Sequence, residues 1–141
     1  MDYCTVQDLE THLSTPTLTQ LTSDEGNEID SAVAQEAIIY ASTLTNGYLR
    51  GRYTLPLDTP FPLLRIIAID IAVYRLYSRR MRTDIPEIIA QQYDDAIKML
   101  KDIQKGAITL EEADSSVQAG NYKGNKECTD KLFNRTTLSE Y

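Results

Sequence analysis

The chain has 141 residues, 42% of them apolar, two cysteines and a formal net charge of −7 at pH 7. This length suits one domain with an extension, and the negative charge disfavours a dedicated nucleic-acid binder, which carries a basic excess. Cys4 and Cys128 have no metal-binding spacing and are expected to be free thiols, and no membrane span or signal peptide is recognisable, so we expect synthesis in the cytoplasm without a membrane partner.

The first expected element is a short helix in "TVQDLETHL". Thr5 and Asp8 have the spacing of a capping box, in which each side chain accepts a hydrogen bond from the backbone of the other. Leu9 and Leu13 lie one turn apart, and we expect the helix to end before Pro16.

The acidic stretch "TSDEGNEID" follows, and it invites comparison with a calcium-binding loop. If Gly26 takes the glycine position of an EF-hand, the first and last ligand positions fall on Leu21 and Ala32, which carry no side-chain oxygen. The stretch therefore predicts an acidic helix N-terminus, where negative charge complements the helix dipole.

A second helix is expected from residue 29 to residue 48. Apolar residues recur there every three or four positions and form one stripe: Ile29, Val33, Ala37, Tyr40, Leu44 and Tyr48. Ile38 and Ile39 fall off this stripe, and we expect them to face a second helix or a neighbouring subunit.

The segment "FPLLRIIAIDIAVYRLYSRR" predicts a third helix that is buried on most sides, because only three of residues 63–77 are charged. Three arginines project within roughly 80° of one another at 100° per residue: Arg65, Arg75 and Arg79. Asp70 lies away from them and needs a partner if it is buried. Arg50 and Arg52 are the candidates.

The segment "DIPEIIAQQYDDAIKMLKDIQKG" predicts a fourth helix. Asp84 and Glu87 have capping-box spacing, Pro86 suits the first turn, and Gly106 suits the C-cap. Its apolar stripe comprises Ile89, Tyr93, Ala96, Leu100 and Ile103. We therefore expect an all-α domain over residues 1–110, a bundle of about four helices with a long Pro/Gly loop, and a polar C-terminal extension over residues 111–141 that binds a partner.

Charge is segregated along the chain. Residues 1–49 hold eight acidic residues and no Lys or Arg, whereas residues 50–82 hold seven arginines and two acids. One interpretation is that the two blocks neutralise each other within one fold, and the other is that an acidic face of one copy meets a basic face of the next.

The chemistry of an enzyme is not recognisable. His12 is the only histidine, no glycine-rich phosphate loop or GxSxG motif is present, and the adjacent Asp94 and Asp95 diverge on a helix. We expect no catalytic residue, no cofactor and no bound metal.

The chain contains four characteristic segments, one after another in this order: "MDYCTVQDLE", "LTQLTSDEGNEIDSAVAQEAIIYASTLTNGYLRGRYTLPL", "PFPLLRIIAIDIAVYRLYSRR" and "YDDAIKMLKDIQKGAITL". In this order the chain resembles the Mu-like phage and prophage family of small head–tail neck proteins over about residues 1–110. The most specific parts are "GYLRGRYTLPL" and "DIAVYRLYSRR". We expect the likeness to weaken after "GAITL".

The resemblance implies a structural virion protein of the neck, at the head–tail junction. Such adaptors form a ring, typically of twelve copies, below the portal protein; the ring extends the DNA channel and receives the next neck component or tail terminator. It also implies that the extension grips the portal, through candidates in the stretch "KLFNRTTLSEY": Lys131, Leu132, Phe133, Arg135, Leu138 and Tyr141. An acidic channel would let double-stranded DNA pass without binding it specifically.

The loop "TNGYLRGRYTLPLDTPFP" is long and stiffened by proline, as expected of a binding surface. In a ring it would place three residues, Arg50, Arg52 and Tyr53, against the acidic half of a neighbour. The candidates on that neighbour are Asp24, Glu25, Glu28, Ile38 and Ile39. Alternatively, Leu55, Leu57 and Phe61 fold the loop onto its own core. The alternative function is a nucleic-acid-binding regulator that uses the Arg65, Arg75 and Arg79 stripe.

Overall fold

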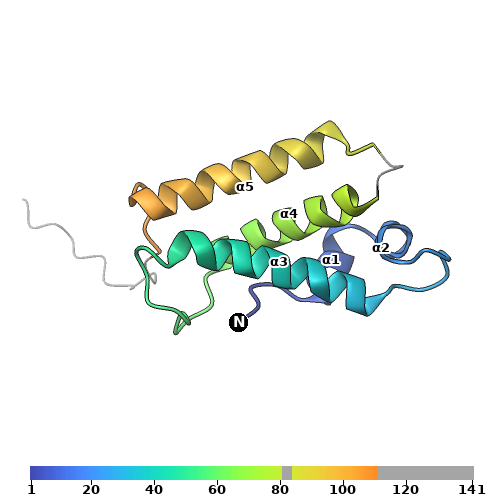
Figure 1. The fold of residues 1–141 in the computed structure, drawn as a ribbon, viewed down its shortest axis with the longest axis horizontal. Coiled ribbons are helices and arrows are strands. Elements are labelled where there is room, and N and C mark those ends of the chain that lie inside the picture. The colour runs from blue at the N-terminus through green and yellow to red at the C-terminus, as the bar shows by residue number, and fades with distance from the viewer. Residues whose placement is uncertain (81–83, 111–141) are drawn as a thin grey trace, which may run out of the picture.

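The computed structural model describes residues 1–80 and 84–110, and this part of the chain is all-α, as predicted. It holds five helices: α1 (Val6–His12), α2 (Thr15–Thr22), α3 (Ser31–Leu49), α4 (Pro62–Arg79) and α5 (Glu87–Lys105). The three long helices, α3 to α5, run side by side with alternating direction, and α1 and α2 pack against α3 and α4 (Figure 1). None of these helices is long and apolar enough to cross a bilayer.

The expectation that the first helix ends before Pro16 is confirmed, since α1 ends at His12. The sequence nevertheless predicted one helix fewer, because Pro16 was not recognised as the start of a new helix. Pro16 instead lies in the first turn of α2, where its missing N–H costs nothing. Leu18 and Leu21 are buried and attach this short helix to the core.

The ends of the helices test the predicted caps. At α1 the capping box is present: the Asp8 carboxylate accepts from the Thr5 N–H at 2.8 Å, and the Thr5 hydroxyl accepts from the Asp8 N–H at 3.4 Å. The capping box predicted for Asp84 and Glu87 is wrong, because Pro86 occupies the N-cap of α5 and no side chain caps this end. Gly106 ends α5 with a φ of 84°, as predicted.

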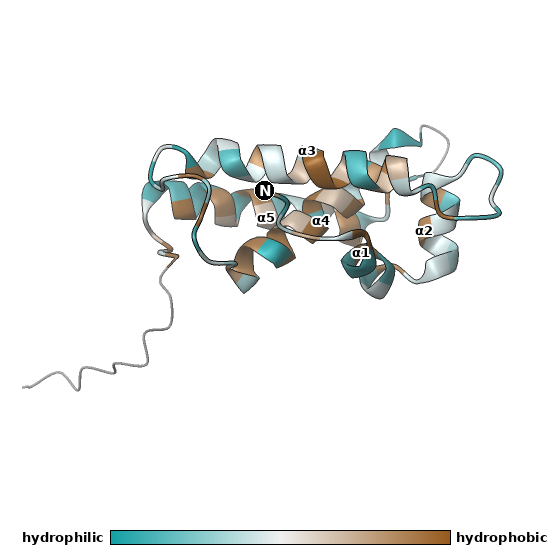
Figure 2. Ribbon diagram, turned by 90° about the horizontal axis from the view of Figure 1, so that it is seen from below, coloured by the Kyte–Doolittle hydropathy of each residue, from teal (hydrophilic) through white to brown (hydrophobic). Residues whose placement is uncertain are grey.

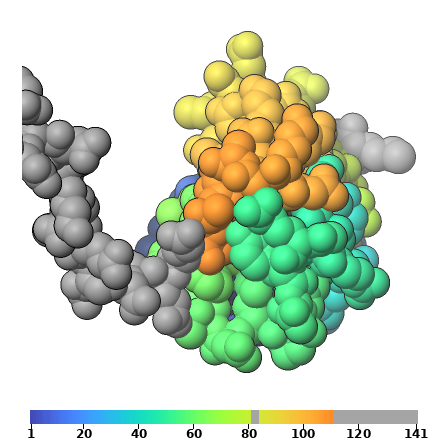
Figure 3. All heavy atoms as spheres, turned by 90° about the vertical axis from the view of Figure 1, so that its left-hand side faces the viewer, coloured from blue at the N-terminus to red at the C-terminus, as the bar shows by residue number. Residues whose placement is uncertain are grey.

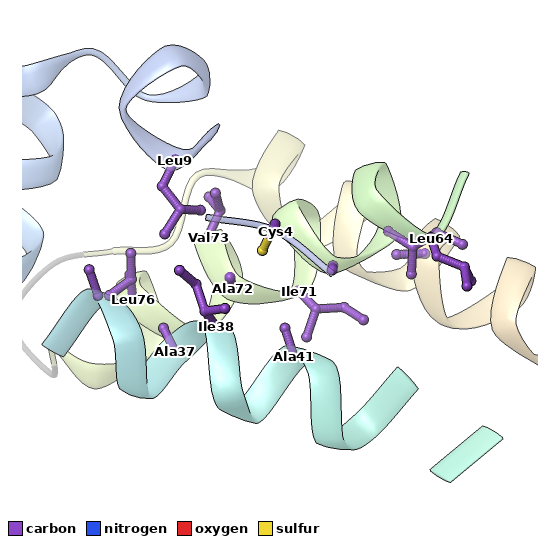
Figure 4. Close-up of a cluster of buried hydrophobic side chains, with 14 of the residues drawn as sticks. Cys4, Leu9, Ala37, Ile38, Ala41, Leu64, Ile71, Ala72, Val73 and Leu76 are labelled. Carbon is purple, nitrogen blue, oxygen red and sulfur yellow. The ribbon is translucent and has the colours of Figure 1, made fainter. Parts of the chain in front are cut away.

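The centre of the core is the contact between α3 and α4, which is built from small residues. Ala37 and Ala41 point from α3 toward α4, where Ala72 lies, and Ile38, Ile71 and Leu76 pack around them (Figure 4). Alanine side chains let two helix backbones approach closely, which brings the flanking large side chains into full burial.

Ile38 is completely buried in the core. Of the two alternatives predicted for it, the one in which it faces a second helix of its own chain is confirmed, and its place among the subunit-interface candidates is wrong. The predicted stripe on this helix followed the large apolar residues and included Tyr40, which is 40% exposed. The buried face is made instead of Ile38 and Leu49 with small residues, namely Ala34, Ala37, Ala41, Ser42 and Thr45. Ile39 is 51% exposed and remains available to a partner.

The two adjacent isoleucines make a matched pair for measuring the α3–α4 contact. We expect Ile38→Ala to lower the free energy of unfolding by about 3 kcal/mol, because it leaves a cavity in a close-packed core. Ile39→Ala should change it by no more than about 0.5 kcal/mol, as is usual at exposed sites. Urea unfolding followed by circular dichroism measures both, and equal losses would contradict the assigned core.

Candidate interaction surfaces

The loop between α3 and α4 has one side on the core and one side exposed. From residue 52 to residue 62 burial alternates along the chain, and the inward side packs its apolar residues on the core: Tyr53, Leu55, Leu57 and Phe61. The interpretation that this loop folds onto its own core is confirmed. The outward side carries Arg52, Thr54, Pro56, Asp58, Pro60 and Pro62.

Tyr53 binds within its own chain, because its hydroxyl accepts a hydrogen bond from the Leu110 N–H at 2.9 Å. Arg52 is exposed, and its guanidinium lies against Gly106, so closely that a side chain at Gly106 would collide with it. A cation at the C-terminus of α5 is favoured by the helix dipole. Arg50 is exposed at the end of α3.

The predicted pairing of Arg50 or Arg52 with Asp70 is wrong, because neither forms an ion pair with it. Asp70 is half-buried on α4. Burial raises the pKa of Asp70, and the nearby His12 lowers it by a smaller amount.

The predicted acidic residues, Asp24, Glu25 and Glu28, are all exposed in the loop between α2 and α3. This hydrophilic loop lies at the end of α3 opposite the loop that joins α3 to α4 (Figure 2). The carboxylate of Asp24 lies 3.2 Å from the Arg80 guanidinium, yet the Asp24 side chain is 82% exposed. Within residues 1–80 and 84–110, Glu25 and Glu28 form no ion pair.

The interpretation that the charge blocks neutralise each other within one fold is therefore confirmed for two pairs, Asp24–Arg80 and Asp8–Arg65. Arg65 donates to the Asp8 carboxylate, and this hydrogen bond holds the pKa of Asp8 below its usual value. The pairs attach α1 and the acidic loop to α4. Among the charges that remain exposed are those at the two ends of α3, acidic before the helix and basic after it.

The three arginines predicted to form a stripe each contact a different element of their own chain. Arg65 binds Asp8 of α1, Arg75 lies over the Tyr40 ring of α3 at 4.7 Å from its centroid, and Arg79 donates to the backbone carbonyl of Thr22 in α2 at 3.4 Å. Intrachain contacts thus divide the stripe, which is unlike the continuous basic surface that nucleic-acid binding requires.

A tyrosine-lined groove between α3 and α5 was missed by the sequence analysis. It has a volume of about 420 Å³, and we call it the tyrosine groove; its lining is Tyr40, Thr43, Leu44, Gly47, Tyr48 and Gln104. Behind it, the rings of Tyr74 (α4) and Tyr93 (α5) stack with centroids 4.1 Å apart. Burial, and then the neighbouring tyrosines, raise the pKa of Tyr93. The signal in the sequence was the spacing of Tyr40, Gly47 and Tyr48, which places all three on one face of a helix.

The remaining predictions concern the two cysteines, bound metal and the portal-binding candidates. Cys4 is a free, buried thiol. The described residues bring together no group of three acidic, histidine or cysteine side chains able to hold a metal. Cys128 and all the portal-binding candidates, from Lys131 to Tyr141, lie outside the described residues.

The chain matches the protein family described as "Bacteriophage Mu, Gp36" over residues 3–126, and it belongs to this family. The "Mu-like prophage FluMu protein gp36" of Haemophilus influenzae is 37% identical over 99 residues, which are 69% of this chain and 67% of that protein. "Gene product J" of Escherichia phage Mu is 31% identical over 108 residues, which are 75% of this chain and 74% of that protein. The match continues to residue 126, so the expectation that the likeness weakens near residue 110 is corrected.

Asp70 gives the fold a specific pH dependence. Because its folded-state pKa is raised above 3.8 by burial, the ionised carboxylate destabilises the fold at neutral pH. We expect Asp70→Asn to raise the free energy of unfolding at pH 7, as measured with urea. When the pH falls through the raised pKa, folded wild type binds a proton before unfolded chain does and gains stability, so the advantage of the variant shrinks.

The matched control is Asp58→Asn, which removes an exposed carboxylate and should leave the free energy of unfolding within about 0.5 kcal/mol of wild type at every pH. A loss of stability in Asp70→Asn at pH 7 would mean that the Asp70 carboxylate stabilises the fold, contrary to this assignment.

Proposed function

We propose that this chain is a structural virion protein, a head-to-tail adaptor, and not an enzyme. Copies form a ring, of twelve subunits by the resemblance described above, below the portal protein. The ring extends the DNA channel and binds the next neck component or tail terminator, in the neck of the virion. Membership of the Mu Gp36 family supports a phage origin.

The observation that carries the proposal is the separation of exposed charge along α3. Asp24, Glu25 and Glu28 precede this helix, and Arg50 and Arg52 follow it. Its 19 residues separate the two ends by about 28 Å. Figure 3 shows the arginine end, where α3, α5 and the loop after α3 meet.

A molecule with opposite charge at its two ends fits a neighbour in the same orientation. Such a contact is heterologous, because each copy uses two different surfaces, and it closes into a ring when the rotation allows. Complementary charge fixes the register and disfavours wrong pairings more than it adds affinity.

The electrostatics also suit a conduit for DNA. The net charge is −7, and the arginines of α4 contact their own chain. A surface that neutralised many phosphates would hold DNA tightly by releasing counterions. An acidic adaptor would let double-stranded DNA pass without specific binding.

The first test is the mass of the purified chain, measured by light scattering, alone and with its cognate portal protein. We expect the chain to co-elute with the portal ring. Deletion of residues 111–141 should abolish co-elution, because we propose that this extension grips the portal, while the circular dichroism of the bundle is retained. A chain that ignores the portal and instead binds DNA increasingly as salt is lowered would contradict the proposal.

The charged contact has its own test. Arg50→Glu with Arg52→Glu should weaken assembly on the portal about tenfold, because like charges then face each other. Adding Glu25→Arg and Glu28→Arg to the same chain should restore it. The matched control is Lys101→Glu, an exposed charge reversal on α5 that should leave assembly unchanged. If the variant with all four substitutions assembles on the portal no better than the double variant, the two charged ends do not contact each other.

A further inference from the structure

We infer that the tyrosine groove of one copy binds the loop between α3 and α4 of a second copy, through the outward side of that loop. We call this side the proline edge, and it consists of Pro56, Asp58, Pro60 and Pro62. The inference rests on the self-association in the proposed function and adds a second contact to it. Three complementary properties of the two surfaces carry it.

The first property is the fit between aromatic rings and prolines. The groove is largely apolar, and Tyr40 and Tyr48 form its walls. Gly47 also lines the groove, and a Cβ added there would meet nothing within 4 Å. Aromatic-lined grooves bind proline-rich segments because both are rigid and lose little entropy on contact. The three prolines of the edge are all exposed.

The second property is hydrogen bonding. Within the described residues, no hydrogen bond involves the hydroxyls of Tyr40 or Tyr48, nor the backbone of residues 54–60. Prolines contribute to this, because they carry a carbonyl but no N–H. A tyrosine hydroxyl of the groove can donate a hydrogen bond to a backbone carbonyl of the loop. Each surface therefore offers a hydrogen-bond partner to the unpaired groups of the other.

The third property is charge. Asp58 is exposed on the proline edge and forms no ion pair with any described residue. Arg75 is exposed beside the groove, with its guanidinium over the Tyr40 ring. A carboxylate from the second copy would complete a Tyr–Arg–Asp arrangement in which the aromatic ring already orients the guanidinium.

A chain cannot fill its own groove with this loop, because Leu55, Leu57 and Phe61 fix the loop to its own core. The occupant is therefore another copy, whose own groove stays open for the next one. The contact uses residues other than those of the charged contact proposed above.

Disulfide trapping between two single variants tests the inference, in a Cys128→Ser background. One variant carries Gly47→Cys in the groove, and the other carries Pro60→Cys on the proline edge. Neither change disturbs the core, because position 47 has open space and Pro60 is exposed. Cys4 stays unreactive, since burial raises its pKa to about 12.

After mild oxidation we expect the mixture to give a covalent dimer on denaturing gels, at least tenfold above either variant alone. A mixture of Pro60→Cys with Gln91→Cys, an exposed position on α5 about 20 Å along the helix from Gln104, is the matched control and should stay at the background. Adding Asp58→Arg to the loop variant should lower the yield several-fold, and adding Arg75→Asp to the groove variant should recover it. The inference is overturned if the mixture gives no more dimer than either variant alone, or no more than the mixture with Gln91→Cys.

A second variant separates this inference from the adaptor function. Gly47→Leu fills the groove, and in a helix a residue other than glycine should maintain or raise thermal stability. We expect it to block assembly on the portal, whereas Gly47→Ala should assemble normally. Normal assembly of Gly47→Leu would overturn the groove contact and leave the adaptor function standing. A dimer trapped between chains that ignore the portal would support the contact and contradict the adaptor.

Discussion

The close approach of α3 and α4 is the constraint on which the other surfaces depend. Alanines at the centre of this contact let Ile38, Ile71 and Leu76 pack completely, with exposures of 1% or less. Since small residues occupy the inner face of α3, its large aromatic residues are displaced to the edge that faces α5. The tyrosine groove is therefore a consequence of how the core is built.

The same arrangement determines which charges remain available. The pairs Asp8–Arg65 and Asp24–Arg80 join the acidic N-terminal block to α4, so part of the charge segregated in the sequence is neutralised within the fold. Of the charges that remain exposed, those next to the ends of α3 are acidic before the helix and basic after it. A bundle with this polarity offers two different surfaces to its neighbours, which is the requirement for a ring.

The sequence predicted those features that depend on neighbours along the chain. Thr5 and Asp8 cap α1, Gly106 ends α5, and the stripe from Ala96 to Ile103 is buried, because capping and helical period are local. It failed where the outcome depended on what packs against a helix. Ile38 was left open between a second helix and a neighbouring subunit, because large apolar residues, and not alanines, were taken to mark the buried face of its helix.

The loop and the groove show a further limit of the sequence. Both interpretations of the loop were open, since alternation of apolar residues and prolines is compatible with packing inward or outward. Only the structure shows that Leu55 and Phe61 face the core while Pro56 and Pro60 are exposed. The groove combines Gly47 and Tyr48 of α3 with Gln104 of α5, and such a pairing of distant segments has no local signal.

The most direct measurement is electron microscopy of particles from the phage that encodes this chain, after its gene has been inactivated. The adaptor account predicts heads and complete tails that remain separate, and tailed particles again when the wild-type chain is supplied. Tailed particles in the absence of the chain, or a failure to form heads at all, would contradict the account.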